Sequence, residues 1–192
     1  MAVLLAACGP ADLEVVEKDL SDHDSDKELT DTTIGFIETS GCDWNVGANA
    51  CDFQLLDQDE GYWRLSEQTG DLILLDLSVM WCGPCNIAAS TVQETQERYE
   101  EQGFQYVTIL IADTQNDTVE EVDIDMWTST YLITTAPVLK GDRNLLQSTG
   151  NSYGFPVSSW PTFILIDRAG NVIYGLRGYD ESLIMQKIEA NL

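Results

Sequence analysis

The segment Trp81-Cys82-Gly83-Pro84-Cys85 lies just beyond an apolar run, Leu72-Ile73-Leu74-Leu75-Asp76-Leu77. This order predicts a strand that leads into a helix, with two cysteines at the junction. Unpaired backbone N–H groups in the first turn of such a helix favour a thiolate at Cys82, and the two-residue spacing brings Cys85 within bonding reach. Pro84 is tolerated because first-turn residues have no helical partner for an N–H group. The pattern therefore predicts a cysteine pair that cycles between dithiol and disulfide.

The same spacing could instead provide half of a zinc site. A zinc site needs further cysteine or histidine ligands, and the sequence contains no second Cys-x-x-Cys or Cys-x-x-His. The only histidine, His23, lies far from the pair in sequence. We therefore expect redox chemistry at Cys82 and Cys85, with no metal and no cofactor.

The segments around this motif predict alternating strands and helices. Phe53–Asp57 and Tyr62–Leu65 read as a hairpin across the turn 59–61. Ala88, Val92 and Tyr99 recur at helical spacing and predict a helix after the cysteines, with a stop at Gly103. Further apolar strands are expected at 106–112, 162–167 and 171–176, and a closing helix at 181–190. The long segment 114–152 predicts an amphipathic helix between 119 and 132, a short strand at 137–139 and a small helix at 143–149.

This order resembles the thioredoxin fold: a strand, the WCGPC segment, a helix, the strand 106–112, and Trp160-Pro161 before another strand. The long middle segment is similar to the TlpA/ResA branch of extracytoplasmic thiol-disulfide oxidoreductases, within the AhpC/TSA-redoxin superfamily. The resemblance covers residues 44–192. It implies an α/β, thioredoxin-like fold, with a central mixed β-sheet flanked by helices, an N-terminal β-hairpin and a central helical insertion.

The resemblance also implies catalytic roles. Cys82 is the expected nucleophile that forms a mixed disulfide with the substrate, and Cys85 is the resolving cysteine. Asp76, six residues before Cys82, matches the buried aspartate that accepts a proton from the resolving cysteine in thioredoxins. The alternative is an aspartate that is satisfied by backbone or water and takes no part in catalysis. The lysine that accompanies this aspartate in thioredoxins is missing, since the matching strand position is Ile109.

A second set of residues is implied to bind the substrate. Pro161 matches the cis-proline that faces the cysteines in this family, and a cis bond there would expose the backbone of Trp160 to an extended substrate segment. Trp81 is expected to form an apolar lip beside Cys82. The implied substrate-binding residues are Trp81, Gly83, Pro84, Trp160 and Pro161.

Charge excludes some partners. The 192 residues carry 33 acidic and only 9 basic side chains, for a formal net charge of −24. Nucleic-acid binding needs clustered lysine and arginine, and docking on anionic lipid needs the same. We therefore expect neither partner, and we interpret the acidic surface as a solvated one.

The remaining cysteines bear on location. Cys42 and Cys51 flank a short Gly- and Asn-containing loop and could close it as a structural disulfide, which would imply an oxidising compartment. Two free thiols or a second redox pair are the alternatives. Residues 1–8 end in Leu-Ala-Ala-Cys, which resembles a bacterial lipobox, so Cys8 is a candidate lipidation site at the end of a signal-like segment.

Three segments follow from this interpretation. Residues 1–8 form the lipoprotein signal-like segment, residues 9–33 an acidic disordered linker, and residues 34–192 a thioredoxin-like domain. The expected location is the bacterial cell envelope, facing the periplasm or the exterior, with a lipid anchor at Cys8.

The leading functional hypothesis is a thiol-disulfide oxidoreductase that reduces protein disulfides. It would receive its electrons from a membrane thiol donor, since the periplasm does not reduce it spontaneously. A peroxiredoxin-like peroxidase and a redox-inert binding protein with the same fold are the alternatives. The peroxidase motif places a threonine two residues before the cysteine, which this chain lacks, and copper-binding relatives use a CxxxC pair with a distal histidine, which it lacks as well.

Overall fold

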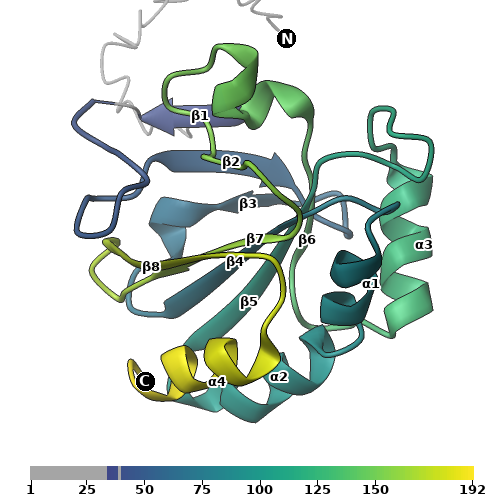
Figure 1. Ribbon diagram of the computed structural model, residues 1–192. Helices are drawn as coiled ribbons and strands as arrows, with labels where there is room; N and C mark the ends of the chain where they lie inside the picture. Colours follow the sequence, from purple (N-terminus) through teal and green to yellow (C-terminus); the bar gives the residue numbers. More distant parts are fainter. Residues whose placement is uncertain (1–33, 39) are drawn as a thin grey trace, which may run out of the picture. The chain divides into compact units, whose positions relative to one another are not determined.

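The computed structural model describes residues 34–38 and 40–192 (Figure 1). The signal-like segment 1–8 with Cys8 and the acidic linker 9–33 lie outside the described residues, so both remain predictions.

A five-stranded sheet with the order β6-β5-β4-β7-β8 forms the centre of the fold. β4 (Leu72–Ser78) is buried along its whole length, as expected for an apolar run between two neighbours. On one side it pairs in parallel with β5 (Phe104–Leu110), which pairs in parallel with β6 (Val138–Lys140). On the other side it pairs antiparallel with β7 (Thr162–Ile166), which pairs antiparallel with β8 (Val172–Arg177). The predicted central mixed sheet is confirmed.

A smaller sheet with the order β1-β2-β3 precedes the central one in the chain. β2 (Asp52–Leu56) and β3 (Tyr62–Arg64) form the predicted hairpin. The Asp57 carboxylate closes its turn by accepting the backbone N–H of Gly61 at 2.8 Å. β1 (Gly35–Glu38) pairs with the other side of β2 and was not predicted.

The segment after the cysteines was expected to form one helix, and this was wrong. α1 (Gly83–Ala89) ends and α2 (Val92–Tyr99) begins anew, because Ser90 and Thr91 donate their hydroxyls back to carbonyls of the preceding turn. Gly103 ends this region with φ +74°, which glycine adopts without strain. The closing helix α4 (Glu181–Glu189) was predicted correctly.

The helical insertion is present between β5 and β7. Its main helix is α3 (Glu121–Tyr131), which starts with a capping box between Glu120 and Asp123. The predicted small helix at 143–149 is instead two separate 3₁₀ turns, η3 (Arg143–Leu145) and η4 (Gln147–Thr149). Two further 3₁₀ turns complete the elements: η1 (Leu65–Gln68) and η2 (Glu100–Gln102).

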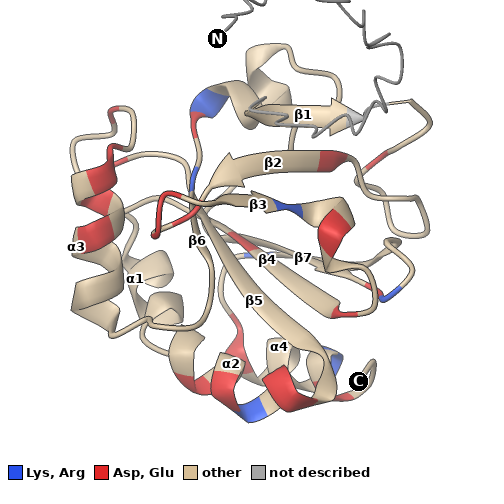
Figure 2. Cartoon of the chain, turned by 180° about the vertical axis from the view of Figure 1, so that it is seen from behind, with Lys and Arg blue, Asp and Glu red and all other residues tan. Residues whose placement is uncertain are grey.

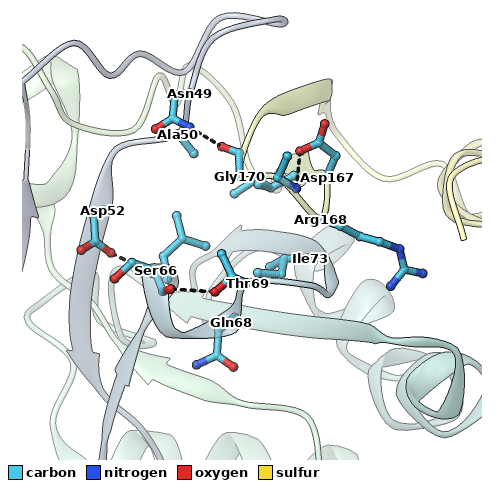
Figure 3. A pocket seen from close by; sticks show the side chains of 13 residues that line it. Asn49, Ala50, Asp52, Ser66, Gln68, Thr69, Ile73, Asp167, Arg168 and Gly170 are labelled. Atoms are coloured by element: carbon cyan, nitrogen blue, oxygen red, sulfur yellow. Dashed lines mark hydrogen bonds between the residues drawn. The ribbon is translucent and has the colours of Figure 1, made fainter.

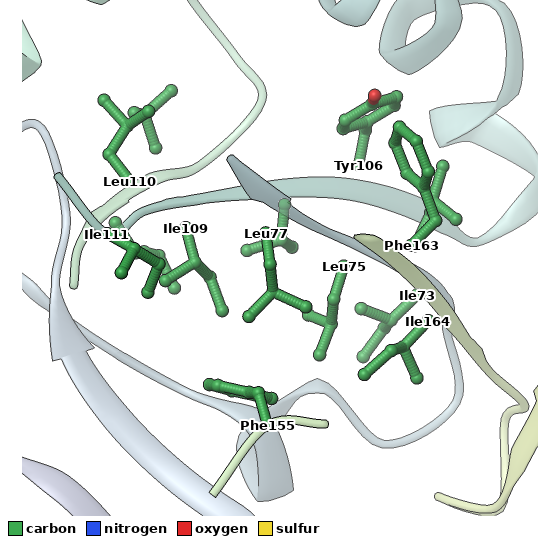
Figure 4. Close-up of a cluster of buried hydrophobic side chains, with 14 of the residues drawn as sticks. Ile73, Leu75, Leu77, Tyr106, Ile109, Leu110, Ile111, Phe155, Phe163 and Ile164 are labelled. Carbon is green, nitrogen blue, oxygen red and sulfur yellow. The ribbon is translucent and has the colours of Figure 1, made fainter. Parts of the chain in front are cut away.

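The two faces of the central sheet carry different side chains (Figure 4). One face carries the buried apolar side chains of Leu75, Leu77 and Ile109, with Phe155 packed below them. Phe155 continues into an aromatic cluster with Phe36, Trp44 and Phe53, whose ring centroids lie 4.7–6.4 Å apart. This cluster joins the central sheet to the small one.

The opposite face is covered by α2 and α4 (Figure 1). Tyr106 and Phe163 lie on it, and strand register places Asp76 beside them. The hydroxyl of Tyr99 in α2 donates to Glu189 in α4 at 2.8 Å and ties the two helices together. A buried carboxyl group therefore lies between the sheet and its helices.

Acidic residues occur on many elements of the described residues, and several of them lie on α2 and α3 (Figure 2). α1, by contrast, has the sequence GPCNIAA and carries no charge. No helix among the described residues is long and apolar enough to cross a membrane.

Candidate active site

Cys82 and Cys85 lie at the carboxyl end of β4, where the chain turns into α1. They are joined as a disulfide, with their Cα atoms 5.2 Å apart. Cys82 is the N-cap residue of α1, and its sulfur accepts the backbone N–H of Cys85 at 3.3 Å. Cys82 is 6% exposed and Cys85 is fully buried. Of these two cysteines, Cys82 is therefore the one that a reactant in solution can reach. The backbone N–H of Cys85 already points at its sulfur.

Asp76 is completely buried in the middle of β4. Its two oxygens have separate partners: Ser78 Oγ donates to Oδ1 at 2.6 Å, and Tyr106 Oη donates to Oδ2 at 3.2 Å. Burial raises the pKa of Asp76 to about 7, although both hydrogen bonds act in the opposite direction. The group can therefore gain or lose a proton near neutral pH.

The peptide bond between Trp160 and Pro161 is cis. Pro161 directly precedes Thr162, which pairs with Leu77 near the end of β4. The loop therefore lies at the same end of β4 as the cysteines. The Pro161 carbonyl accepts the N–H of Gly178 at 2.8 Å, and Thr162 Oγ1 donates to the Ser159 carbonyl at 2.7 Å. Trp160 is half-buried beside it.

The indole of Trp81 is 48% exposed but held in place. Its Nε1–H donates to Asn116 Oδ1 at 2.9 Å, and the Arg143 guanidinium donates to the same oxygen. Asn116 has φ +69°, in a turn that Asp113 closes by accepting backbone N–H groups of residues 115 and 117. The insertion, through Arg143, thus contributes to the position of a side chain next to Cys82.

Asn86 stands where the resembled family commonly has a lysine. Its amide donates to the carbonyls of Met80 and Cys82, at 3.2 and 2.9 Å, and its Oδ1 accepts the hydroxyl of Tyr131 at 2.6 Å. It therefore connects the turn before α1 to α3 of the insertion. A lysine could not accept the tyrosine hydroxyl, so this departure has a structural reason.

Comparison with known proteins now identifies the family, since the AhpC/TSA family pattern matches residues 46–175. The chain belongs to the AhpC/TSA family. Among solved structures, a protein from Chlorobium tepidum that carries the name thiol:disulfide interchange protein DsbE is 26% identical, with a TM-score of 0.63; the match covers 78% of this chain and 99% of that one. The exposed lipoprotein thioredoxin Etrx1 from Streptococcus pneumoniae is also 26% identical, with a TM-score of 0.54, and the match covers 72% and 98% of the two chains.

A curated relative points to the same chemistry over a shorter span. Thioredoxin F2 of Arabidopsis thaliana chloroplasts is 28% identical over 96 residues, or 48% of this chain. The match spans about half (46%) of the length of that relative. As a thioredoxin-like member of the AhpC/TSA family, the chain has the fold of thiol-disulfide oxidoreductases, in agreement with the resemblance to the TlpA/ResA branch.

This AhpC/TSA-family chain contains a second disulfide, Cys42–Cys51, with a Cα–Cα distance of 4.8 Å. It closes the loop that precedes β2, and the loop pairs through backbone hydrogen bonds with the turn before β8. The structure therefore shows Cys42 and Cys51 joined as a disulfide and not as two free thiols.

A cavity of about 160 Å³ lies at the opposite end of the central sheet, between Ile73 at the start of β4 and the turn at 167–170 (Figure 3). Its charged groups are already paired. Asp52 accepts from Arg64 at 2.7 Å, and Arg168 donates to backbone carbonyls of residues 70, 102 and 103. Within the described residues, no group of three or more acidic, histidine or cysteine side chains could hold a metal ion.

The structure brings the sequence-predicted residues together around the end of β4. Cys82, Cys85, Trp81, Gly83 and Pro84 form the strand-to-helix junction, with the cis bond of Trp160-Pro161 at the same end and Asp76 inside the strand. Sequence reasoning missed the partners of Asp76 and Trp81, which are Ser78, Tyr106 and Asn116. It also missed the bond between Tyr131 and Asn86. Ser78 could have been found, because it lies two residues after Asp76 and so on the same face of the strand.

Proposed function

We propose that this protein is an extracytoplasmic thiol-disulfide oxidoreductase that reduces protein disulfides through a dithiol-disulfide cycle of Cys82 and Cys85. The observation that carries the proposal is the arrangement at the end of β4. One sulfur is slightly exposed and accepts a backbone N–H, the second is buried one turn into α1, and a buried carboxyl group titrates near neutral pH in the preceding strand. These are the parts that thiol-disulfide exchange needs.

The cycle starts from the reduced pair. The Cys82 thiolate attacks one sulfur of a substrate disulfide, a mixed disulfide forms, and the other substrate sulfur leaves as a thiolate that takes up a proton. Cys85 then gives its proton to the Asp76 carboxylate and attacks the Cys82 sulfur. The Cys82–Cys85 disulfide forms, and the second substrate sulfur is released. Two electrons have passed to the substrate, so each turnover needs a dithiol donor, which we propose to be a membrane thiol-transfer protein.

The surface around Cys82 favours a polypeptide as substrate. Trp81 is 48% exposed and Ile87 on α1 is 60% exposed, while α1 itself is uncharged in a strongly acidic chain. Exposed apolar side chains next to the attacking sulfur can hold the apolar residues that flank a protein disulfide. The loop of Trp160 and Pro161, at the same end of β4 as Cys82, is the proposed partner of an extended substrate segment.

The proposed location rests on three observations. The Cys42–Cys51 disulfide favours an oxidising compartment. Solved relatives include thiol:disulfide interchange proteins and an exposed lipoprotein thioredoxin. The lipobox-like segment before Cys8 supports a lipid anchor in the bacterial cell envelope.

Reduction of insulin disulfides by the purified protein, with dithiothreitol as electron donor, tests the activity. We expect turnover by the wild type and a fall to the uncatalysed rate in Cys82→Ser, because among the described cysteines Cys85 is buried and Cys42 and Cys51 are bridged. Cys8→Ser is the matched control and should keep full activity. Cys85→Ala should retain substrate as a mixed disulfide on Cys82, which non-reducing gels detect.

The direction of electron flow is tested separately through the reduction potential of the pair. A reductase requires a potential well below that of the strong oxidant DsbA, which is about −120 mV. A value near the DsbA potential would contradict the proposed direction, and a wild type that fails to reduce insulin would contradict the activity.

A further inference from the structure

Asp76 has an unusual set of partners for a buried carboxylate. Each of its oxygens accepts one hydroxyl, from Ser78 in its own strand and from Tyr106 in β5. Both donors are fully or almost fully buried. Within the described residues, no lysine or arginine bonds to this carboxyl group, so hydroxyl dipoles alone offset the cost of burying its charge.

The other neighbours of Asp76 add little charge. β7 contributes Phe163, which has no ionisable group, opposite Asp76. The segment between β8 and α4 contributes Tyr179, whose hydroxyl contacts Thr91 Oγ1 at 3.1 Å. Burial is the main cause of the raised pKa of Tyr179. Cys82 and Cys85, beyond the carboxyl end of the same strand, are bridged in this structure and ionise only when reduced. Ser78 and Tyr106 are therefore the groups that counteract burial at Asp76.

Hydroxyls suit a carboxyl group that changes its protonation state. A hydroxyl donates to an ionised carboxylate, and after rotation it can accept from a protonated one. A lysine ammonium can only donate, so it favours the ionised form alone. The Ser78 and Tyr106 hydroxyls can therefore satisfy Asp76 both before and after it takes up a proton, without a rearrangement of the backbone.

We propose that Tyr106 and Ser78 are positioning residues that fix the orientation of the Asp76 carboxyl group and set how readily it takes up and returns a proton during exchange. The inference rests on the proposed function, in which Asp76 accepts the proton of Cys85. It assigns to two residues outside the WCGPC segment a role in proton transfer at Asp76.

The test follows the titration of Asp76 directly, by infrared spectroscopy of the oxidised protein, in which the cysteines do not titrate. The band of the protonated carboxyl group is identified by its loss in Asp76→Asn. In Tyr106→Phe the ionised form loses a donor, so the midpoint of this band should move upward by about one pH unit. Ser78→Ala should move it in the same direction, and it serves as the second variant if Tyr106→Phe does not fold.

Thr108→Val is the matched control. Thr108 lies opposite Asp76 in the strand register, is buried, and has an Oγ1 without a hydrogen-bond partner in the described part of the chain. Its replacement removes a buried hydroxyl from the same face but no bond to Asp76, so the midpoint should stay. An unchanged midpoint in both Tyr106→Phe and Ser78→Ala, or an equal shift in Thr108→Val, would overturn the inference.

The pH profile of insulin reduction gives a second measurement that a purely structural role would not move. Its acid limb should shift upward with the carboxyl midpoint in Tyr106→Phe and remain in place in Thr108→Val. The infrared titration does not depend on turnover. A wild type that fails to reduce insulin would therefore refute the proposed function, while the midpoints would still decide whether Tyr106 and Ser78 control Asp76.

Discussion

The two disulfides of this protein are the same chemical bond in very different surroundings. Cys42–Cys51 closes a loop over a separation of nine residues, beside the aromatic cluster between the two sheets. Cys82–Cys85 spans three residues at the start of a helix, with a backbone N–H on one sulfur. The first closes a loop whose backbone hydrogen-bonds to the turn before β8, and the second lies at the end of the strand that contains the buried Asp76 carboxyl group.

Each disulfide also has a neighbouring tryptophan. The one beside Cys42–Cys51 is buried, and the one beside Cys82–Cys85 is exposed. Trp44 is buried, and its indole donates to the backbone carbonyl of Tyr153 at 2.8 Å. Trp81 is half exposed, and its indole donates to a side chain, Asn116. The comparison indicates that the surroundings, rather than the bond itself, separate a disulfide suited to structure from one suited to exchange. Changes to these surroundings test that conclusion.

The largest expected effect concerns Asp76, the fully buried carboxyl group in the strand that leads to Cys82–Cys85. Its pKa is raised from 3.8 to about 7 by burial. Below about pH 4 the folded and unfolded chains both hold the proton. Between about pH 4 and 7 the unfolded chain releases it while the folded chain keeps it, so stability falls as pH rises. Above about pH 7 the full cost, about 4 kcal/mol, is present.

The measurement is urea unfolding of the oxidised wild type and of Asp76→Asn at about pH 4 and pH 8. The stability of the variant relative to the wild type should increase by about 4 kcal/mol between these conditions, because asparagine carries no charge to bury. Asp59→Asn, at an exposed position in the hairpin turn, serves as a control and should show no such increase. A pH-independent difference for Asp76→Asn would mean that the carboxyl group is ionised in the folded protein throughout this range.

The next effect concerns the structural pair. Removal of the bridge in Cys42→Ala/Cys51→Ala should lower the free energy of unfolding by about 2–3 kcal/mol, because the unfolded chain is no longer constrained over this short loop. Insulin reduction at a temperature where the variant is folded should be unchanged. Denaturant unfolding and the activity assay measure the two quantities separately. Lost activity in the folded variant would show that Cys42 and Cys51 take part in exchange.

The sequence predicted the central sheet, the hairpin and the cysteine junction because each is encoded locally. An apolar run marks β4, turn residues mark the hairpin, and the spacing of Cys82 and Cys85 marks the site. The break between α1 and α2 was missed because Ser90 and Thr91 are tolerated in helices, and only their bonds to carbonyls of the preceding turn reveal the interruption.

The partners of the site residues could not be predicted for a different reason. Sequence matching pointed to Ile109 as the residue to compare with the missing lysine. The strand register instead puts Thr108 and Tyr106 on the face of Asp76, and Ile109 on the opposite face with Leu77. Whether a tyrosine in an apolar strand reaches a carboxyl group 30 residues away depends on pairing between strands, which the local pattern does not contain.

The smallest expected effect concerns the position of Trp81, the exposed member of the tryptophan pair. Asn116→Gly removes the oxygen that accepts from Trp81 and Arg143, and it preserves the turn because glycine adopts φ +69° freely. A single exposed hydrogen bond contributes about 1 kcal/mol or less, so the free energy of unfolding should hardly change. The freed indole would bind a protein substrate less well, so KM for insulin should rise a few-fold with kcat unchanged.

Asn116→Asp keeps an acceptor oxygen and should restore the wild-type KM. An unchanged KM in Asn116→Gly would show that Trp81 does not need this contact to meet a substrate, and the difference between the two tryptophans would then be one of burial alone.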